Sequence, residues 1–222
     1  MTTMVSNLEL IRRVPLFSVL TAAQAASVAD TVVKRRFKRG EPIVEQGKKS
    51  NALSIILTGR ARVVTTDARG REVILATMHP GDYVGEMSLI DNEPHSATVR
   101  AEVQTDMLIL GRAEFARCLP ENSSLSYAIM RGLVQRLRSA DRQIESLALL
   151  DVYGRVARTL LDMSEMDGEL KIIRNKVSRQ DLAKVVGASR EMVSRVMKDL
   201  EGRGMVQTQE NGWVVIKEQL TA

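Results

Sequence analysis

The sequence predicts an α+β fold in three consecutive parts: a β sandwich or barrel, a long helix, and a helix-turn-helix followed by a β hairpin. Three patterns support this prediction. Short apolar runs separated by glycines fill residues 34–110, an apolar repeat of helical period fills residues 123–150, and two capped helices flank a glycine near the C-terminus. With 222 residues, 44% of them hydrophobic, the chain can bury a sizeable core in one large or two modest domains.

The N-terminal segment, residues 7–31, carries apolar side chains at helical spacing, such as Leu8, Ile11 and Leu20. Pro15 lies inside this segment, and a proline within a helix removes a hydrogen bond and clashes with the preceding turn. We therefore expect two short helical pieces here.

The next segment has the texture of an all-β domain. Its runs include ALSIILTG, ARVVTT, EVILATM and DMLILG, with turn signals about every ten residues. TDARGRE, between two of these runs, is predicted to be a hairpin turn.

One stretch of this domain, GEMSLIDNEPHSATVR, contains a turn and then a strand. Gly85 and Glu86 belong to a turn of small residues that carries one carboxylate. Pro94 and His95 lead into a strand-like run that begins at Ser96. A loop of this kind can hold a small polar ligand against a sheet.

The long predicted helix has apolar residues at steps of three or four, with one seven-residue gap that Ala140 partly fills. They are Leu125, Ile129, Leu133, Leu137, Ile144 and Leu147. The opposite face carries Arg131, Arg136, Arg138, Arg142 and Glu145. The repeat favours a dimer seam, and packing against the helix's own domain is the alternative.

Residues 152–164 form a further amphipathic pattern, DGELKI predicts a turn and a short strand, and a helix-turn-helix follows. Ser178 is expected to cap its first helix with Asp181 as capping-box partner, and Ser189 to cap the second. Gly187 permits the left-handed conformation that a sharp turn needs. Val193, Val196, Met197 and Leu200 are expected to point inward.

The other side of the second helix carries polar side chains suited to base edges: Arg190, Glu191, Ser194, Arg195 and Lys198. Arginine can donate to guanine O6 and N7 together, and glutamate can accept from cytosine N4. Two strands around Asn211 and Gly212 then form a hairpin wing. Turn, caps, base-reading side chains and wing occur in the order of a DNA-binding motif. A solvated helix face beside an ordinary hairpin is the alternative.

Composition narrows the class of protein. The net charge of +5 is compatible with nucleic acid, although only the placement of the charges can support that function. One cysteine, Cys118, cannot form an internal disulfide. No run of about 18 apolar residues and no signal-peptide pattern occurs, so we expect a cytoplasmic protein without a membrane span.

The whole arrangement resembles the Crp/Fnr family of bacterial transcription regulators. PGDYVGEMSLI resembles the phosphate-cassette entry of cyclic-nucleotide-binding domains, LALLDVYGRVARTLLDM resembles the passage from the dimer helix into the hinge, and SREMVSRVMKDLE is similar to a recognition helix of the family. The resemblance implies a jelly-roll effector domain over 1–122, a dimerisation helix over 123–150 and a winged helix-turn-helix over 151–222.

The resemblance also implies partners and roles. It implies a nucleoid-associated homodimer on palindromic DNA with TGTGA-like half-sites, about 34 Å apart on one face of the duplex, and contact with RNA polymerase. Arg190, Glu191 and Arg195 would read bases. Arg179 and Gln180 would lie near the phosphate backbone. The full implied DNA contact set is Ser178, Arg179, Gln180, Ser189, Arg190, Glu191, Ser194, Arg195 and Lys198.

The implied effector site departs from its cyclic AMP-binding relatives. Glu86 matches the glutamate that holds the ribose hydroxyl, but His95 stands where an arginine holds the cyclic phosphate, followed by Ser96. Guanidinium is always charged and binds phosphate through two donors, whereas imidazole is half charged only near pH 6.5. Ala140 and Asp141 replace two hydroxyl residues that touch the adenine. Asp141 brings a negative charge toward an anion.

We therefore expect the effector to be a nucleotide second messenger other than cyclic AMP in its usual binding mode. The resemblance makes cyclic di-GMP a candidate, because some branches of the family respond to it, and its guanine edges suit Asp141, Arg138, Arg142 and Arg100. The expected effector residues are Gly85, Glu86, His95, Ser96, Arg138, Ala140 and Asp141. Weak cyclic AMP binding, an empty site in an always-active regulator, and a His95 without a ligand role are the alternatives.

An enzyme is the alternative from another class. A jelly roll with Gly85 and Glu86 could suggest a cupin-like metal site, but such sites need several histidines and this chain has two, His79 and His95. The sequence also lacks a P-loop and a recognisable pair of catalytic carboxylates. We predict a protein that is not an enzyme and holds no metal.

Overall fold

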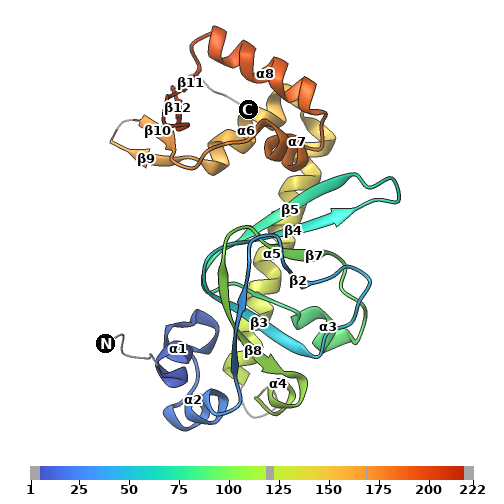
Figure 1. Ribbon diagram of the computed structural model, residues 1–222, viewed down its shortest axis with the longest axis vertical. Helices are drawn as coiled ribbons and strands as arrows, with labels where there is room; N and C mark the ends of the chain where they lie inside the picture. The colour runs from blue at the N-terminus through green and yellow to red at the C-terminus, as the bar shows by residue number, and fades with distance from the viewer. Residues whose placement is uncertain (1–5, 119–122, 169, 218–222) are drawn as a thin grey trace. The chain divides into compact units, whose positions relative to one another are not determined.

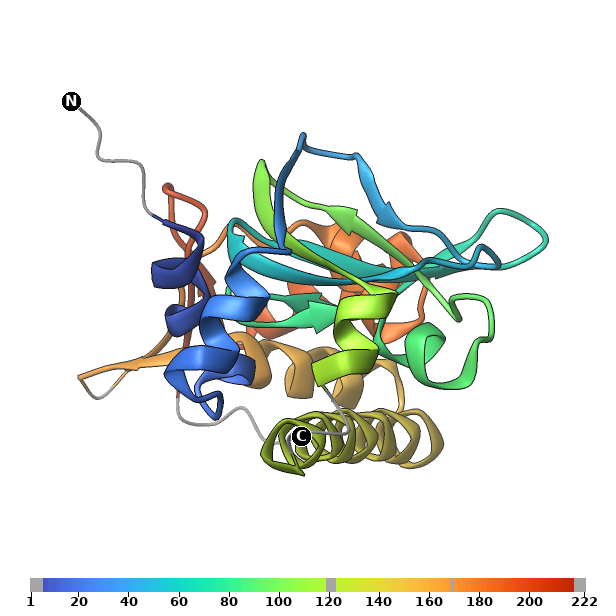
Figure 2. The same cartoon turned by 90° about the horizontal axis from the view of Figure 1, so that it is seen from below.

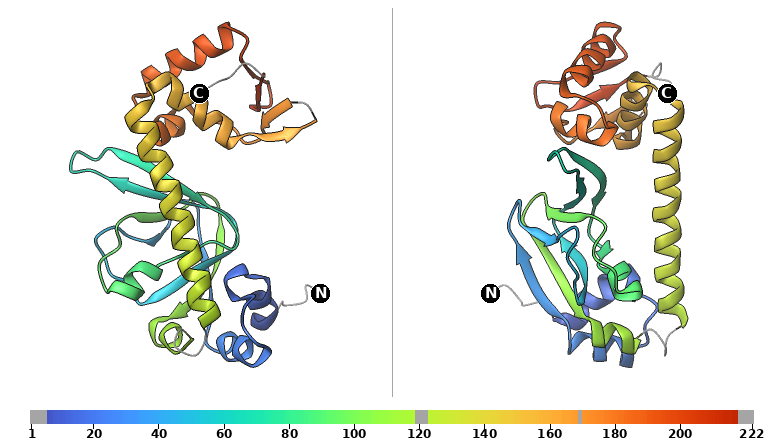
Figure 3. Two further views of the ribbon diagram at one scale, coloured as in Figure 1. Left: turned by 180° about the vertical axis from the view of Figure 1, so that it is seen from behind. Right: turned by 90° about the vertical axis from the view of Figure 1, so that its right-hand side faces the viewer.

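The computed structural model describes residues 6–118, 123–168 and 170–217. The chain divides into two compact units, residues 1–136 and 137–222. The boundary falls within α5 (Ser123–Leu149), which Figure 3 shows as one continuous helix. In the described part of the chain, no helix is long and apolar enough to cross a membrane.

The first unit begins with two short α-helices, α1 (Asn7–Arg13) and α2 (Ala22–Ala29), as predicted. Ser6 and Thr21 each form a capping box at the start of one helix. Between the helices lies a 3₁₀ turn, η1 (Pro15–Phe17), with the proline at its first position. Pro15 therefore ends one helix and starts a tighter turn, since its fixed φ suits a first helical position.

Eight strands of the first unit form two antiparallel four-stranded sheets, ordered β1-β8-β3-β6 and β2-β7-β4-β5 (Figure 1). The strands are β1 (Val33–Phe37), β2 (Pro42–Val44), β3 (Ala52–Thr58), β4 (Ala61–Thr66), β5 (Glu72–Met78), β6 (Tyr83–Val84), β7 (Thr98–Ala101) and β8 (Thr105–Gly111). The predicted hairpin turn joins β4 to β5.

The central strands β3 and β8 are buried on both faces, which explains their nearly continuous apolar sequences. Ile56 and Met107 lie in the core between the two sheets. Leu53, Leu108 and Leu110 face the other way and pack in a core with α1, α2 and the first turns of α5. The predicted β sandwich is thus confirmed, and Figure 2 shows α1 and α2 beside it.

Helix α5 packs differently from the predicted seam. Leu125 and Ile129 are buried in the core of the first unit, and Leu133 packs against that core. The prediction that these three residues face a partner is therefore wrong. Tyr127, Met130, Val134, Leu137 and Ile144 form a second, exposed apolar stripe on α5, and Leu147 and Leu149 near the end of the helix are exposed as well. Two apolar stripes lie on one helix, and apolar periodicity alone did not separate them.

Two short helices of the first unit were not predicted. Helix α3 (Glu86–Asp91) occupies the place of the expected turn, and α4 (Arg112–Cys118) follows β8. The strand expected from Ser96 begins at Thr98.

The described part of the second unit contains the end of α5, three further helices and one antiparallel sheet, ordered β11-β12-β10-β9. Its elements are the last part of α5, α6 (Val152–Met163), β9 (Glu165–Asp167), β10 (Leu170–Ile173), α7 (Arg179–Val186), α8 (Arg190–Gly202), β11 (Val206–Thr208) and β12 (Val214–Ile216). Apolar residues of α6, α7, α8 and the strands share one core. Strand β9 was not predicted, because its sequence, EMD, is polar at two of three positions.

Candidate effector cassette and DNA-reading helix

The cassette begins where strand β6 turns into helix α3. Gly85 joins the two with φ of 99°, a left-handed conformation that other residues rarely adopt. A Cβ at this position would lie 2.5 Å from the carbonyl oxygen of Ala52, so space also requires glycine. The backbone thereby places Glu86 as the first residue of α3.

The carboxylate of Glu86 is buried and paired with an arginine of α5. Its side chain is 1% exposed, and Nη1 of Arg136 lies 2.5 Å from its Oε1. Burial raises the pKa of Glu86 above its ordinary value, and the charge of Arg136 acts in the opposite direction. Because the pKa stays raised, desolvation outweighs the attraction of the cation. Glu86 is therefore a buried acceptor that further hydrogen-bond donors would stabilise.

Arg136 makes two further contacts with the cassette. Its Nη2 donates to the backbone oxygen of Tyr83, and its guanidinium carbon lies 5.0 Å from the centroid of the Tyr83 ring. From the sequence Arg136 was expected only on the polar face of the long helix, so this contact was not predicted. A buried carboxylate needs a cationic or donor partner, so a search for one among the helix arginines could have found it.

His95 is also buried, being 9% exposed. Its Nδ1 lies 3.2 Å from Oγ of Ser88, and its backbone bonds with Lys48 and Gly47 in a neighbouring loop. Burial lowers the pKa of His95 below 6.5, so the imidazole is neutral at pH 7. Among the described residues, Nε2 of His95 is buried without a hydrogen-bond partner. Ser96, next in the chain, is exposed.

The other predicted effector residues lie on α5 beyond the first unit. Arg138, Ala140 and Asp141 are all exposed on this helix and belong to the second compact unit. Arg100 lies on β7 and pairs with Glu72 at 3.3 Å. The group that the first unit brings together is therefore Gly85, Glu86, His95 and Arg136.

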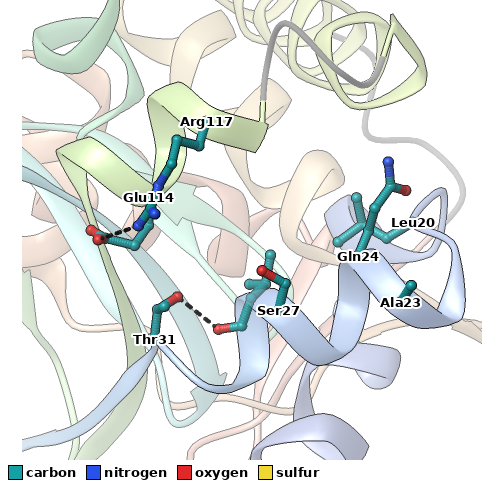
Figure 4. A pocket seen from close by; sticks show the side chains of 8 residues that line it. Leu20, Ala23, Gln24, Ser27, Thr31, Glu114 and Arg117 are labelled. Atoms are coloured by element: carbon teal, nitrogen blue, oxygen red, sulfur yellow. Dashed lines mark hydrogen bonds and ion pairs between the residues drawn. The ribbon is translucent and has the colours of Figure 1, made fainter.

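A separate depression of about 300 Å³ lies between α2 and α4 (Figure 4). Its polar groups bond locally: Thr31 donates to the Val28 carbonyl, and Arg117 pairs with Glu114 at 2.9 Å. Thr31, Glu114 and Arg117 are therefore already engaged in local contacts. Among the described residues, no group of three or more His, Cys, Asp or Glu could hold a metal ion.

The helix-turn-helix of the second unit has the predicted caps and turn. Oγ of Ser178 accepts from the N–H of Asp181 at 3.1 Å, and Oγ of Ser189 accepts from that of Met192 at 3.2 Å. Gly187 ends α7 with φ of 65°. These caps fix where α8 begins, so its first turn has a defined direction.

Helix α8 has an apolar inner face and a polar outer face. Val193, Val196, Met197 and Leu200 are buried, as predicted. The five polar side chains predicted to read or flank bases are exposed: Arg190, Glu191, Ser194, Arg195 and Lys198. Hydrogen bonds from its own backbone and from Ser189 lower the pKa of Glu191, so it is an ionised acceptor. The hydroxyl of Ser194 donates to the Arg190 carbonyl at 2.8 Å.

Arg179 and Gln180, the two residues predicted to lie near the DNA phosphate backbone, differ in their exposure to solvent. Gln180 is exposed, whereas Arg179 is partly buried and donates to Glu201 at 3.0 Å. The same carboxylate oxygen of Glu201 accepts from the hydroxyl of Thr208 at 2.7 Å. Glu201 of α8 therefore links Arg179 of α7 to Thr208 of the wing. The wing itself is β11 and β12, with Gly212 left-handed in the loop between them, as the sequence predicted.

Comparison with known proteins agrees with this geometry. The cyclic nucleotide-binding domain family matches residues 34–122, and the Crp-like helix-turn-helix domain family matches residues 154–219. The fold and these matches define a DNA-binding protein with a cyclic nucleotide-binding domain.

Individual relatives narrow the class further. The chain is 34% identical over 189 residues to the cAMP-activated global transcriptional regulator Vfr of Pseudomonas aeruginosa, covering 82% of this chain and 88% of that protein. It is 30% identical over 168 residues to the cAMP-activated global transcriptional regulator CRP of Escherichia coli O157:H7, covering 74% and 80%. The chain belongs to the Crp/Fnr family of transcription regulators.

A solved structure shares both fold and sequence. The c-di-GMP responsive global regulator CLP of Xanthomonas campestris matches with a TM-score of 0.73 and 28% identity, covering 88% of this chain and 98% of that chain. Relatives named for two different nucleotides are thus similar to this chain.

Burial of His95 predicts a specific pH dependence of stability. Since its pKa is lowered in the folded state, the unfolded chain takes up this proton first as the pH falls. The stability that neutral, buried His95 contributes to the folded state is therefore fully present above pH 6.5. It is lost as the pH falls toward the folded-state pKa of His95. We expect wild-type protein to lose more unfolding free energy than His95→Gln between about pH 7.5 and about pH 5.5, measured by urea denaturation. If the unfolding free energies of the wild-type protein and of His95→Gln changed equally with pH, the burial of His95 would be contradicted.

Proposed function

We propose that this protein is a homodimeric, sequence-specific DNA-binding regulator whose DNA affinity is controlled by a nucleotide second messenger. The proposed parts are an effector domain over 1–122, a dimerisation helix over 123–150 and a DNA-binding domain over 151–222. The observation that carries the proposal is the exposed outer face of α8, where Arg190, Glu191 and Arg195 project from a helix whose start is capped and whose other face is buried.

Base reading follows from the chemistry of that face. Arg190 and Arg195 can each donate to guanine O6 and N7, and ionised Glu191 can accept from cytosine N4. Lys198, one turn further on, suits a phosphate oxygen. These groups fit a half-site that contains adjacent G and C, such as TGTGA.

Dimerisation follows from the exposed stripe on α5. Tyr127, Met130, Val134, Leu137 and Ile144 are exposed apolar residues, and Asp141 completes their alternating steps of three and four. This is the a/d spacing of a two-stranded coiled coil. A helix with such a stripe exposed is stabilised by a second copy, and a two-fold dimer matches a palindromic operator.

The cassette supports a nucleotide effector, with cyclic di-GMP favoured over cyclic AMP. The neutral, buried His95 cannot supply the permanent charge with which arginine holds a cyclic phosphate. The guanidinium that the structure places in the cassette is that of Arg136, and it pairs with Glu86. Asp141 could accept from the N1–H and amino group of guanine, and Arg138 could donate to guanine O6 and N7. The response of CLP to c-di-GMP supports this choice.

Two alternatives keep specific support. Vfr and CRP are named as cAMP-activated, and Glu86 retains the position of the ribose-binding glutamate, which favours a cyclic AMP response. An effector-independent regulator is favoured if the Glu86–Arg136 pair is the permanent state of the cassette. We also propose that RNA polymerase is a partner and that the protein acts in the cytoplasm at the nucleoid, without catalytic activity.

Base reading is tested first by Arg190→Ala. Removing a bidentate guanine contact should cost about 1–3 kcal/mol on a palindromic TGTGA-type duplex and relax its sequence preference. Fluorescence anisotropy on specific and random duplexes measures both. Lys198→Ala is the matched control, because loss of a phosphate contact should weaken both duplexes equally. An equal loss for Arg190→Ala on both duplexes would reduce it to a phosphate contact.

Dimerisation is tested by Leu137→Asp. The stripe already contains the carboxylate of Asp141. A further carboxylate at position 137 would be buried against the same residue of the partner protomer, so the dimer dissociation constant should rise at least about tenfold. Analytical ultracentrifugation measures the dissociation constant, and DNA affinity should fall with it. Gln135→Asp, which adds the same charge at an exposed position outside the stripe, should leave the dimer intact. An unchanged dimer in Leu137→Asp would exclude this stripe as the seam.

The effector assignment is tested by calorimetry with cyclic AMP and cyclic di-GMP. We expect cyclic di-GMP to bind the wild-type protein more tightly. His95→Arg should raise cyclic AMP affinity, since a charge-assisted hydrogen bond contributes about 1.5–3 kcal/mol. Circular dichroism checks that the variant folds. A folded His95→Arg without any gain would show that position 95 does not face the cyclic phosphate.

A further inference from the structure

Gly132 lies in the interior of α5, where glycine is less favourable than almost any other residue. Its backbone is not left-handed, so chain geometry does not require glycine here. Packing does: a Cβ at this position would overlap the hydroxyl oxygen of Tyr83 and lie 3.2 Å from its ring carbon Cζ. The absence of a side chain at 132 forms a notch that receives the end of the tyrosine ring.

Tyr83 holds α5 at three successive points. Its hydroxyl donates to the carbonyl oxygen of Ile129 at 3.4 Å, the end of its ring fills the notch at Gly132, and its ring and backbone oxygen both contact Arg136. The tyrosine is 8% exposed, and burial raises its pKa above the ordinary value, so the hydroxyl keeps its proton at pH 7. The residue that begins the strand into the cassette therefore also fixes the seat of the helix.

The position of this seat bears on the effector site. Arg136 is one helical turn beyond Gly132, and its guanidinium bonds with both Glu86 and Tyr83. A shift of α5 away from Tyr83 would draw Arg136 away from Glu86, because the helix moves as a rigid body over one turn. A tyrosine whose ring simply filled the core would need neither the glycine nor the hydroxyl contact.

We propose that Tyr83 and Gly132 are a positioning pair that holds α5 in register with the cassette, so that occupation of Glu86 by an effector is transmitted to the helix through Arg136. This inference rests on the proposed function, in which a nucleotide binds the cassette. An effector hydroxyl that donates to Glu86 competes with Arg136. Because the helix stays anchored at residues 129 and 132, release of Arg136 changes the part of α5 that follows it.

The experiment uses the full chain and four variants: Gly132→Ala, Tyr83→Phe, the double variant, and Gln135→Ala as an exposed control on the same helix. Alanine is a better helix former than glycine, so helix propensity alone predicts a higher Tm for Gly132→Ala. The notch instead predicts that the Tm of Gly132→Ala falls by about 2–4 °C. In the double variant the Tm should recover to that of Tyr83→Phe, because the colliding hydroxyl is then gone.

The second readout is how much a nucleotide changes DNA affinity. It is the dissociation constant for a palindromic TGTGA-type duplex without nucleotide divided by that with nucleotide, measured separately for cyclic di-GMP and for cyclic AMP. Typical coupling is about 5- to 150-fold. We expect Gly132→Ala to reduce the wild-type ratio to within about twofold of unity, the double variant to restore most of it, and Gln135→Ala to leave it unchanged.

The outcomes separate the two proposals. If neither nucleotide changes the DNA affinity of the wild-type protein, so that both ratios are one, the proposed control by a nucleotide is overturned. The regulatory role of Tyr83 and Gly132 is then overturned with it. A wild-type response that Gly132→Ala retains in full overturns the positioning pair alone. A higher Tm in Gly132→Ala shows that the notch contact does not form, which also overturns the pair. A ratio that is lost in Gly132→Ala while the variant is still folded and binds DNA, and that Tyr83→Phe restores, supports the pair, because unfolding of the variant then cannot explain the lost coupling.

Discussion

The interaction on which the effector unit depends is the burial of one carboxylate, Glu86, beside one guanidinium, Arg136. Taking the carboxylate out of water costs more than the arginine returns, as the raised pKa of Glu86 shows. Arg136 is itself 43% exposed, so solvent screens part of the attraction. The pair is therefore a weak source of stability. Its value lies in leaving a buried acceptor whose energy improves when another donor, such as a ribose hydroxyl, reaches it.

Helix α8, the proposed DNA-reading helix, obeys a different constraint, which is the division of its surface into two faces. Val193, Met197 and Leu200 must be buried to form the core of the second unit, and helical spacing then leaves Arg190 and Arg195 exposed. Glu201 binds Arg179 and Thr208, which fixes α8 against α7 and the wing. The charges that face solvent are thus held on a rigid scaffold, as a base-reading surface requires.

The sequence predicted the parts of the structure that depend on local signals. Caps at Ser178 and Ser189, the left-handed Gly187 and the inner face of α8 follow from neighbouring residues alone, and the structure confirms each. The cassette was predicted less well, since the burial of His95 and the partner of Glu86 depend on contacts about fifty residues apart in the chain. The long helix was ambiguous because it carries two apolar stripes, and only packing shows which one the first unit uses.

These features meet on α5. Its inner residues Ile129 and Arg136 contact Tyr83 and Glu86, while the exposed stripe lies on the same turns. An effector can shift an equilibrium only through contacts that differ in free energy between two states. The Glu86–Arg136 pair is proposed to be such a contact, because a donor that binds Glu86 would compete with the arginine. Since one helix carries both this pair and the stripe proposed to bind a second copy, a change at the cassette would act on the proposed dimer seam without an intermediate element.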